Sequence, residues 1–231
     1  MKTSLILLTL NERECLEAVF PQIPAPGPDS GYDEIVAVDG GSTDGTLEFY
    51  KEKGVKVIGQ SKRGRGEAFL QTFRELKDSD AYIFFSPDGN EDLKDLSKFK
   101  KYINEGADLV IASRMMPESV NEEDHQFFKF RKWANNAFNW AVNVFFNRSG
   151  QFVTDSINGY RAITRKAAET LQLNAHDYTI EYQMTIRAMK HKLKIKEFPT
   201  IEGQRIAGDT GAPSIPTGIR FIKRFFKELF N

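Results

Sequence analysis

Two oxygen-bearing side chains follow a short apolar run in the first half of the chain. Residues 82–85 read as a buried strand that stops at Pro87, and Asp88 and Asn90 come directly after it. A carboxylate is a hard anionic ligand suited to Mg²⁺ or Mn²⁺, and an amide offers a neutral oxygen. A strand followed by an Asp-Gly turn has the same residues. This segment alone therefore leaves both interpretations open.

Polar side chains also follow two other predicted strands. Glu12 comes shortly after the first strand, and Asp39 ends the second. Because parallel strands end at one edge of a sheet, we expect Glu12, Asp39 and Asp88 to converge there. Asp39 can accept a hydrogen bond from a base amide or a ribose hydroxyl, and Asp88 can hold a metal against a diphosphate. Three carboxylates at one edge are more than turns require.

Apolar runs of strand length alternate with helical patterns and would position these side chains. This alternation predicts an α/β fold with a mostly parallel, twisted sheet and helices on both faces. We expect one domain over 1–216 and a C-terminal amphipathic helix over 217–231. The predicted strands are 4–10, 33–39, 55–58, 81–85, 109–112 and 194–201, and a turn and a strand are expected within 152–164. The predicted helices are 12–19, one ending near 53, 67–77, 93–104, 127–146, 165–171, 179–191 and 218–230.

Composition narrows the class of protein. The chain has 231 residues, of which 32 are basic and 32 acidic, so no net charge favours binding to nucleic acid. The single cysteine, Cys15, excludes an internal disulfide and fits a reducing compartment. No apolar run of about 18 residues predicts a membrane span. We expect a cytoplasmic protein.

Common nucleotide-binding motifs are missing. The sequence contains no Gly-x-x-x-x-Gly-Lys-Ser/Thr loop, and no Gly-x-Gly-x-x-Gly follows the first strand. A basic, glycine-rich loop over 62–66, with Lys62 and Arg65, does follow the third strand. Such a loop can close over phosphate, but it can equally be a solvated turn.

Six segments in the right order resemble a known family. The chain is similar to the inverting GT-A glycosyltransferases, and within them to the dolichol-phosphate-mannose synthase type. The resemblance covers about the first 205 residues. Ser86 stands at the first aspartate of the Asp-x-Asp position, so Asp88 is the only acid that remains there. The matching segments are 9–12, 38–46, 62–66, 86–90, 113–114 and 155–161.

The resemblance implies a GT-A (Rossmann-like) fold, a nucleotide-sugar donor such as a GDP- or UDP-hexose, and Mg²⁺ or Mn²⁺ held by Asp88 and Asn90. Arg114 would meet the lipid phosphate of the acceptor or the phosphates of the donor, and Arg205 would close on the diphosphate. The implied donor-binding residues are Thr9, Leu10, Glu12, Val38, Asp39, Lys62, Arg65, Pro87 and Arg205.

Acceptor chemistry separates the possible functions. A polyprenyl phosphate is already an oxyanion and needs mainly positioning and charge neutralisation. A glycan or glycolipid hydroxyl needs a general base, for which Glu181 is the best candidate. A glutamate in a first helical turn also has a purely structural explanation. A nucleotide-sugar-binding protein without activity is a third possibility.

Two aromatic segments bear on the acceptor. In the last predicted helix, Ile222, Phe225, Phe226 and Leu229 recur at helical spacing among basic residues, as in helices that lie in a membrane interface. The helix over 127–146 is apolar around much of its circumference. Core packing would explain either helix equally well. Together they favour peripheral attachment to a membrane surface.

Overall fold

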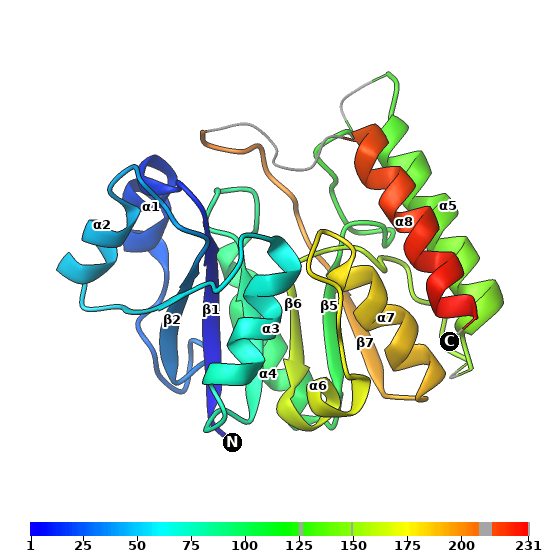
Figure 1. Ribbon diagram of the computed structural model, residues 1–231, viewed down its shortest axis with the longest axis horizontal. Coiled ribbons are helices and arrows are strands. Elements are labelled where there is room, and N and C mark those ends of the chain that lie inside the picture. The colour runs from blue at the N-terminus through cyan, green and yellow to red at the C-terminus, as the bar shows by residue number, and fades with distance from the viewer. Residues whose placement is uncertain (125–126, 149, 208–213, 231) are drawn as a thin grey trace.

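The computed structural model describes residues 1–124, 127–148, 150–207 and 214–230. Seven strands form one sheet in the order β3-β2-β1-β4-β6-β5-β7, flanked by helices on both faces (Figure 1). The strands are β1 (Thr3–Thr9), β2 (Glu34–Asp39), β3 (Lys56–Gly59), β4 (Ala81–Phe85), β5 (Leu109–Ser113), β6 (Arg161–Thr164) and β7 (Ile195–Pro199). The mostly parallel sheet predicted from the sequence is confirmed.

Helices connect most of these strands. The α-helices are α1 (Arg13–Val19), α2 (Thr46–Glu52), α3 (Arg65–Glu75), α4 (Leu96–Asn104), α5 (Phe130–Phe146), α6 (Arg165–Leu171), α7 (Ile180–Lys190) and α8 (Ser214–Leu229). Two 3₁₀ turns adjoin helices: η1 (Phe20–Gln22) directly follows α1, and η2 (Leu93–Asp95) directly precedes α4. The predicted loop over 204–216 lies partly outside the described residues.

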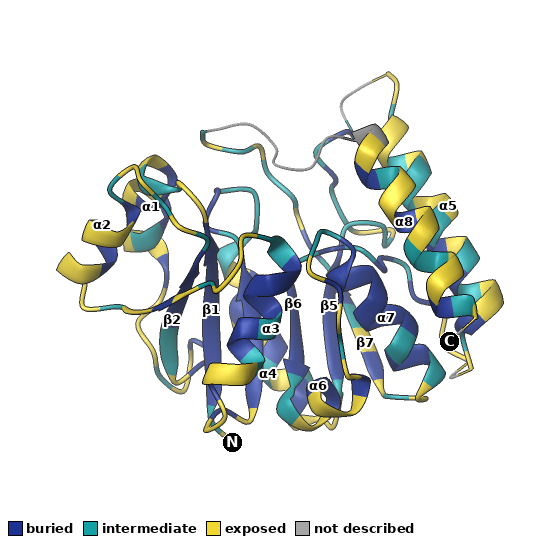
Figure 2. Ribbon diagram, in the orientation of Figure 1, coloured by how far each residue is buried: buried dark blue, intermediate teal, exposed yellow. Residues whose placement is uncertain are grey.

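The central strands are buried on both faces, which explains their continuous apolar runs. In β1, Leu5 and Leu7 belong to the core under α1, α2 and α4, whereas Ile6 and Leu8 belong to the core under α3, α6 and α7. Figure 2 shows the sheet as almost entirely buried. The alternation of side chains along β1 therefore supplies two cores from a single strand.

Strand direction brings the polar strand ends together. β1 pairs in parallel with both β2 and β4, so Thr9, Asp39 and Phe85 end at one edge of the sheet. β6 is antiparallel to both β4 and β5, so β5 runs in the same direction as β4. Arg114, just after β5, therefore reaches the same edge. The convergence expected from the sequence is confirmed for these strand ends.

Helices α5 and α8 lie side by side beyond the β5–β7 end of the sheet (Figure 1). Phe221 and Phe146 are buried in the core, and Phe225 packs against it. The predicted apolar stripe of α8 is divided in the structure. Phe225 and Leu229 pack on the core, whereas Ile222 and Phe226 are 50% and 51% exposed. No helix among the described residues is long and apolar enough to cross a membrane.

Candidate functional site

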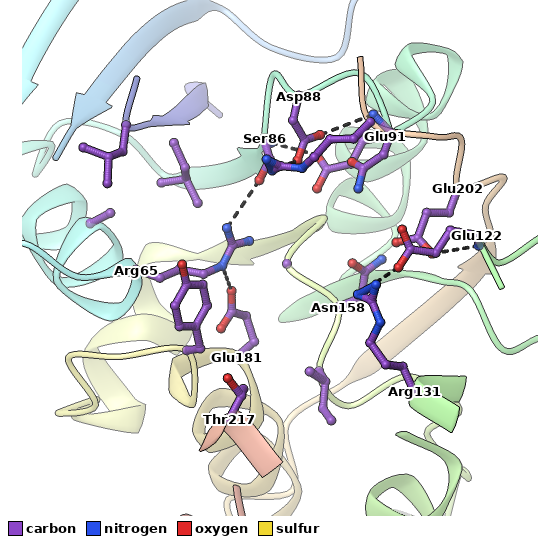
Figure 3. Close-up of a pocket in the computed structure, with 18 of the residues that line it drawn as sticks. Arg65, Ser86, Asp88, Glu91, Glu122, Arg131, Asn158, Glu181, Glu202 and Thr217 are labelled. Atoms are coloured by element: carbon purple, nitrogen blue, oxygen red, sulfur yellow. Dashed lines mark hydrogen bonds and ion pairs between the residues drawn. The ribbon is translucent and has the colours of Figure 1, made fainter. Parts of the chain in front are cut away.

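A cavity of about 930 Å³ opens at the carboxyl edge of the sheet. The ends of β1, β4 and β5 form its floor, and residues of α3, α5, α7 and α8 form its sides (Figure 3). Predicted site residues that line it are Thr9, Leu10, Glu12, Arg65, Asp88, Asn90, Arg114, Glu181 and Arg205. Four others, Val38, Asp39, Lys62 and Pro87, are not among its lining residues.

Asp88 lies in the turn after β4 and is 4% exposed. Arg205 Nη2 donates a hydrogen bond of 2.5 Å to Asp88 Oδ2, and the backbone amide of Asn90 donates one of 3.3 Å to Oδ1. Burial raises the pKa of Asp88, and the charge of Arg205 opposes that rise. A cation at this carboxylate is therefore favourable, whether it is a guanidinium or a metal ion.

The segment that carries Arg205 is attached to the same turn. The amide of Gly203 donates to the carbonyl of Asn90 at 2.8 Å, and the amide of Ile206 donates to the carbonyl of Asp88 at 2.9 Å. Gly89 has φ +90°, and a Cβ there would lie 2.5 Å from Ile206 Cδ1. Glycine is required here for both its conformation and its size. The turn and the C-terminal segment thus form one wall of the cavity.

Glu91 is a partly buried acid beside this turn. Its Oε2 accepts a 2.8 Å hydrogen bond from the backbone amide of Ser86. Burial, reinforced by the charge of Asp88, raises the pKa of Glu91 well above its ordinary value. Asn90 lies between Asp88 and Glu91 in the sequence, and its side-chain Oδ1 is buried without a hydrogen-bond partner. Buried polar atoms normally have partners, so this oxygen is available to a ligand.

These atoms fit a divalent cation only in part. Asp88, Glu91 and Asn90 offer hard oxygen ligands, which suit Mg²⁺ or Mn²⁺. Within the described part of the chain, no three His, Cys, Asp or Glu side chains are grouped so as to hold a metal ion. A cation here would need further oxygens from a bound molecule or from water. Mg²⁺ is usually bound in this way, by one or two carboxylates and the phosphates of a substrate.

Asp39 organises the loop after β2. Its Oδ1 accepts hydrogen bonds of 2.8 Å from the amides of both Gly41 and Ser42. Its Oδ2 accepts 2.5 Å and 3.3 Å bonds from the hydroxyls of Ser42 and Thr9. Both oxygens are therefore engaged within the protein. Its neighbour Gly40 lines the cavity, as does Leu10, which is 39% exposed.

Arg65 begins α3 and points into the cavity, where it forms an ion pair with Glu181 (Figure 3). Its Nη1 lies 3.4 Å from Ser86 Oγ. Burial lowers the pKa of Arg65, but the charge of Glu181, the hydrogen bond to Glu181 and the charge of Glu91 together outweigh this effect and leave the pKa raised. The helix approaches the 172–179 segment closely, since a Cβ at Gly66 would lie 2.2 Å from the carbonyl oxygen of Ala175. Lys62, by contrast, is exposed.

Arg114 forms the opposite wall. It binds Asp155 through Nε at 2.8 Å and Nη2 at 3.2 Å, and it binds Glu202 through Nη1 at 3.1 Å. Arg131, at the start of α5, pairs with Glu122 at 3.0 Å. Burial raises the pKa of Glu122, with a further contribution from Glu202. This wall therefore carries two arginines and a fixed set of carboxylates.

Sequence reasoning did not single out several residues that line the cavity. Glu91 is adjacent to Asn90 and could have been found by extending the matching segment 86–90 by one residue. Glu122 and Glu202 lie in irregular segments with no periodic pattern. The residues missed are Glu91, Glu122, Arg131, Asn158, Tyr178 and Glu202.

Known proteins resemble this chain in both sequence and fold. Glycosyltransferase AglJ of Haloferax volcanii is 29% identical over 230 residues, covering 96% of this chain and 71% of that protein. The dolichol-phosphate mannosyltransferase of Pyrococcus furiosus is 28% identical over 215 residues, covering 91% of this chain and 59% of that protein.

A solved structure gives the same fold. Glucosyl-3-phosphoglycerate synthase of Mycobacterium tuberculosis, in complex with Mn²⁺, UDP and glucosyl-3-phosphoglycerate, superposes with a TM-score of 0.76. The match covers 99% of this chain and 80% of that one at 19% identity. The GT-A fold and the resemblance to the dolichol-phosphate-mannose synthase type are thus confirmed.

One family model accounts for most of the chain. The model of glycosyl transferase family 2 matches residues 4–171, which include Asp39, Arg65, Asp88 and Arg114. The chain therefore belongs to glycosyl transferase family 2 and is a nucleotide-sugar-dependent glycosyltransferase.

Proposed function

We propose that this enzyme transfers a hexose from a GDP- or UDP-hexose to a polyprenyl phosphate, with inversion at the anomeric carbon and with Mg²⁺ or Mn²⁺ bound. The observation that carries the proposal is the continuity of the cavity. Its inner wall holds Asp88 and Asn90, and its outer side is lined by Phe130, Phe138 and Phe221 of α5 and α8. The cavity therefore has a polar part for the phosphate of a polyprenyl phosphate and, adjoining it, an apolar part for its hydrocarbon chain.

The outer faces of the same helices extend this apolar surface. Trp133 and Trp140 of α5 are 55% and 61% exposed, and Ile219 and Phe226 of α8 are 50% and 51% exposed. Exposed basic residues of α8, Arg220, Lys223 and Lys227, lie among them. Aromatic rings beside basic side chains are typical of helices at a membrane interface. We infer that this face meets the membrane in which a polyprenyl phosphate resides.

On the donor side, Asp88 and Asn90 would hold the cation, which stabilises negative charge on the departing nucleoside diphosphate. Glu12 and the loop organised by Asp39 would hold the nucleoside. Arg205 would contact the diphosphate, since the segment that carries it is hydrogen-bonded to the turn of Asp88 and Asn90. Protein arginines recognise phosphate through charge-assisted hydrogen bonds.

The acceptor phosphate needs no general base. One of its oxygens attacks the anomeric carbon, the bond from that carbon to the diphosphate oxygen breaks, and the nucleoside diphosphate leaves with the electron pair. Arg114 and Arg131 on the opposite wall would orient and neutralise the attacking phosphate. In-line attack inverts the configuration of the transferred sugar.

A hydroxyl acceptor is the second candidate because Glu181 lines the cavity. Its Oε1 is engaged by the guanidinium of Arg65, however, so this oxygen is not free to accept a proton from a hydroxyl. This contact favours a phosphate acceptor over a hydroxyl acceptor.

The test compares two lipids that differ only in the phosphate. Purified enzyme receives GDP-mannose or UDP-glucose with Mn²⁺ and either a polyprenyl phosphate or the matching polyprenol. We expect nucleoside diphosphate release and sugar transfer only with the phosphate. Asp88→Asn should abolish transfer, and Asp78→Asn, at the opposite edge of the sheet, should not. Equal transfer to the free alcohol would contradict the proposal.

A further inference from the structure

Glu91 places a carboxylate at the end of β4, where Ser86 stands at the first aspartate position of the Asp-x-Asp segment. Ser86 occupies the first position of the Asp-x-Asp segment, and Glu91 lies five residues further along the chain. The turn between them folds back, so that Glu91 Oε2 is 2.8 Å from the backbone amide of Ser86. The carboxylate of Glu91 is therefore held at the backbone of Ser86, whose own side chain carries no carboxylate.

Glu91 lies among other charged side chains of the cavity. Asp88 and Glu202 are like charges that act on it, and Arg65 is the opposing charge. Arg65 is already engaged with Glu181. Burying an acid beside other acids costs free energy unless a cation compensates for the charge.

A second observation points to a ligand at this place. Asn90 Oδ1 is buried without a partner, although its residue lies between Asp88 and Glu91 and lines the same cavity. Figure 3 shows Ser86, Asp88 and Glu91 gathered at one corner of that cavity. An unpartnered amide oxygen in a turn that also carries two carboxylates suits a hard divalent cation.

We propose that Glu91 is the second acidic ligand of the divalent cation and holds it together with Asp88 and Asn90 against the donor diphosphate. This inference rests on the proposed function, because the diphosphate supplies the remaining oxygens. It gives Glu91 the electrostatic role that an aspartate at position 86 would otherwise fill.

The alternative role for Glu91 is to stabilise the turn through its hydrogen bond to Ser86. Glu91→Gln separates the two roles, since an amide oxygen can still accept that bond but carries no charge. Glu122→Gln is the matched control, because Glu122 is another acid of the same cavity whose pKa burial raises. Ser86→Asp combined with Glu91→Gln restores an acid at the first position of the segment.

The experiment measures Mn²⁺ binding directly, by the electron paramagnetic resonance signal of free Mn²⁺, with UDP or GDP present and no acceptor. We expect Glu91→Gln to weaken Mn²⁺ binding roughly ten- to a hundredfold, as loss of a metal-supporting residue typically does. Glu122→Gln should bind as wild type, and the double variant should recover most of the affinity. If Glu91→Gln does not fold, Glu91→Asp replaces it, with an expected loss of a few-fold.

Wild-type Mn²⁺ affinity in Glu91→Gln, or in Glu91→Asp where that variant is used, would overturn the inference. Failure of wild-type enzyme to bind Mn²⁺ in the presence of either nucleotide would overturn it as well. The acceptor is tested separately by sugar transfer. A Glu91-dependent Mn²⁺ site in an enzyme that does not use polyprenyl phosphate would support this inference while contradicting the proposed acceptor.

Discussion

Arg205 Nη2 lies 2.5 Å from Asp88 Oδ2, so the C-terminal segment places a guanidinium on the carboxylate expected to bind the metal. Glu12, whose pKa is raised by burial against the opposing charge of Arg205, lies 4.0 Å from the same guanidinium. One arginine therefore partly neutralises two cavity acids. A divalent cation that binds Asp88 must compete with this arginine or share the carboxylate with it.

Replacing Arg205 by methionine should separate metal binding from donor binding. Without nucleotide, Mn²⁺ should bind about fivefold more tightly, because an ion pair with a partly exposed partner contributes up to about 1 kcal/mol. The KM for the nucleotide-sugar should rise, since the diphosphate loses a cationic partner. Calorimetric titration with Mn²⁺ and steady-state kinetics measure the two effects.

Arg63→Met is the matched control for Arg205→Met, because Arg63 also lines the cavity and has no ion pair to Asp88 among the described contacts. It should leave the affinity for Mn²⁺ alone unchanged. Weaker Mn²⁺ binding in Arg205→Met would show that the arginine supports the cation instead of competing with it.

Glu181→Gln should report the class of acceptor. If the acceptor is a phosphate, kcat should fall less than about tenfold, because no proton has to be removed. If the acceptor is a hydroxyl, loss of the base should lower kcat by about 10² to 10⁴. The pH profile adds a second criterion, since a general base produces an acidic limb that the variant would lack. Turnover of wild type and Glu181→Gln, each with the acceptor that the wild-type enzyme uses at saturation, is measured between pH 5.5 and 8.5 and decides between the two.

Much of the fold could be predicted because the necessary signals are local. The strand over 81–85 was predicted with its observed bounds, since five apolar residues lie between charged or turn-forming segments. The parallel direction of β1, β2 and β4 followed from strands that alternate with helices, whereas their order in the sheet did not. The antiparallel insertion of β6 between β4 and β5 did not follow, because it depends on pairing between distant segments.

The site was predictable in part for the same reason. Asp88 and Asn90 lie at a strand end, where position alone suggests chemistry. Arg114 pairs with Asp155, which is 41 residues away in the sequence, and with Glu202, which is 88 residues away. No local pattern in the sequence connects these residues. The pairing of Arg65 with Glu181 spans 116 residues. Sequence spacing can therefore identify cavity residues but cannot assign their ion pairs.

The exposed face of α5 and α8 should bind membranes. Trp140→Gln combined with Phe226→Gln should reduce binding to anionic lipid vesicles by about a hundredfold or more, because each large apolar side chain contributes about 1.5 kcal/mol or more when removed from water. Leu47→Gln on α2 is the control, as Leu47 is also an exposed apolar residue, at 39%. Vesicle co-sedimentation measures the effect, and equal binding by the double variant would refute it.

Glu228 should make the attachment of α8 dependent on pH. It is 1% exposed and accepts hydrogen bonds from Arg187 Nε at 3.0 Å and Gln183 Nε2 at 2.6 Å, both on α7. Burial raises the pKa of Glu228, but these hydrogen bonds and the charges of Arg187 and Arg224 outweigh it, so its pKa is below the ordinary value of 4.5. The unfolded chain therefore takes up a proton at this residue more readily than the folded protein does.

The stabilisation from Glu228 should be complete above about pH 4.5 and should disappear as the pH falls through its lower folded-state pKa. Glu228→Gln should lower the free energy of unfolding by about 2 kcal/mol at pH 7, as expected for a hydrogen bond to a charged group. Glu17→Gln, which breaks an exposed pair with Arg13, should cost less than about 0.5 kcal/mol. Urea unfolding at pH 7, 5, 4 and 3.5 measures both differences. For Glu228→Gln the difference from wild type should shrink below pH 4.5, because protonated glutamate and glutamine are then equally uncharged, and a constant difference would contradict this assignment.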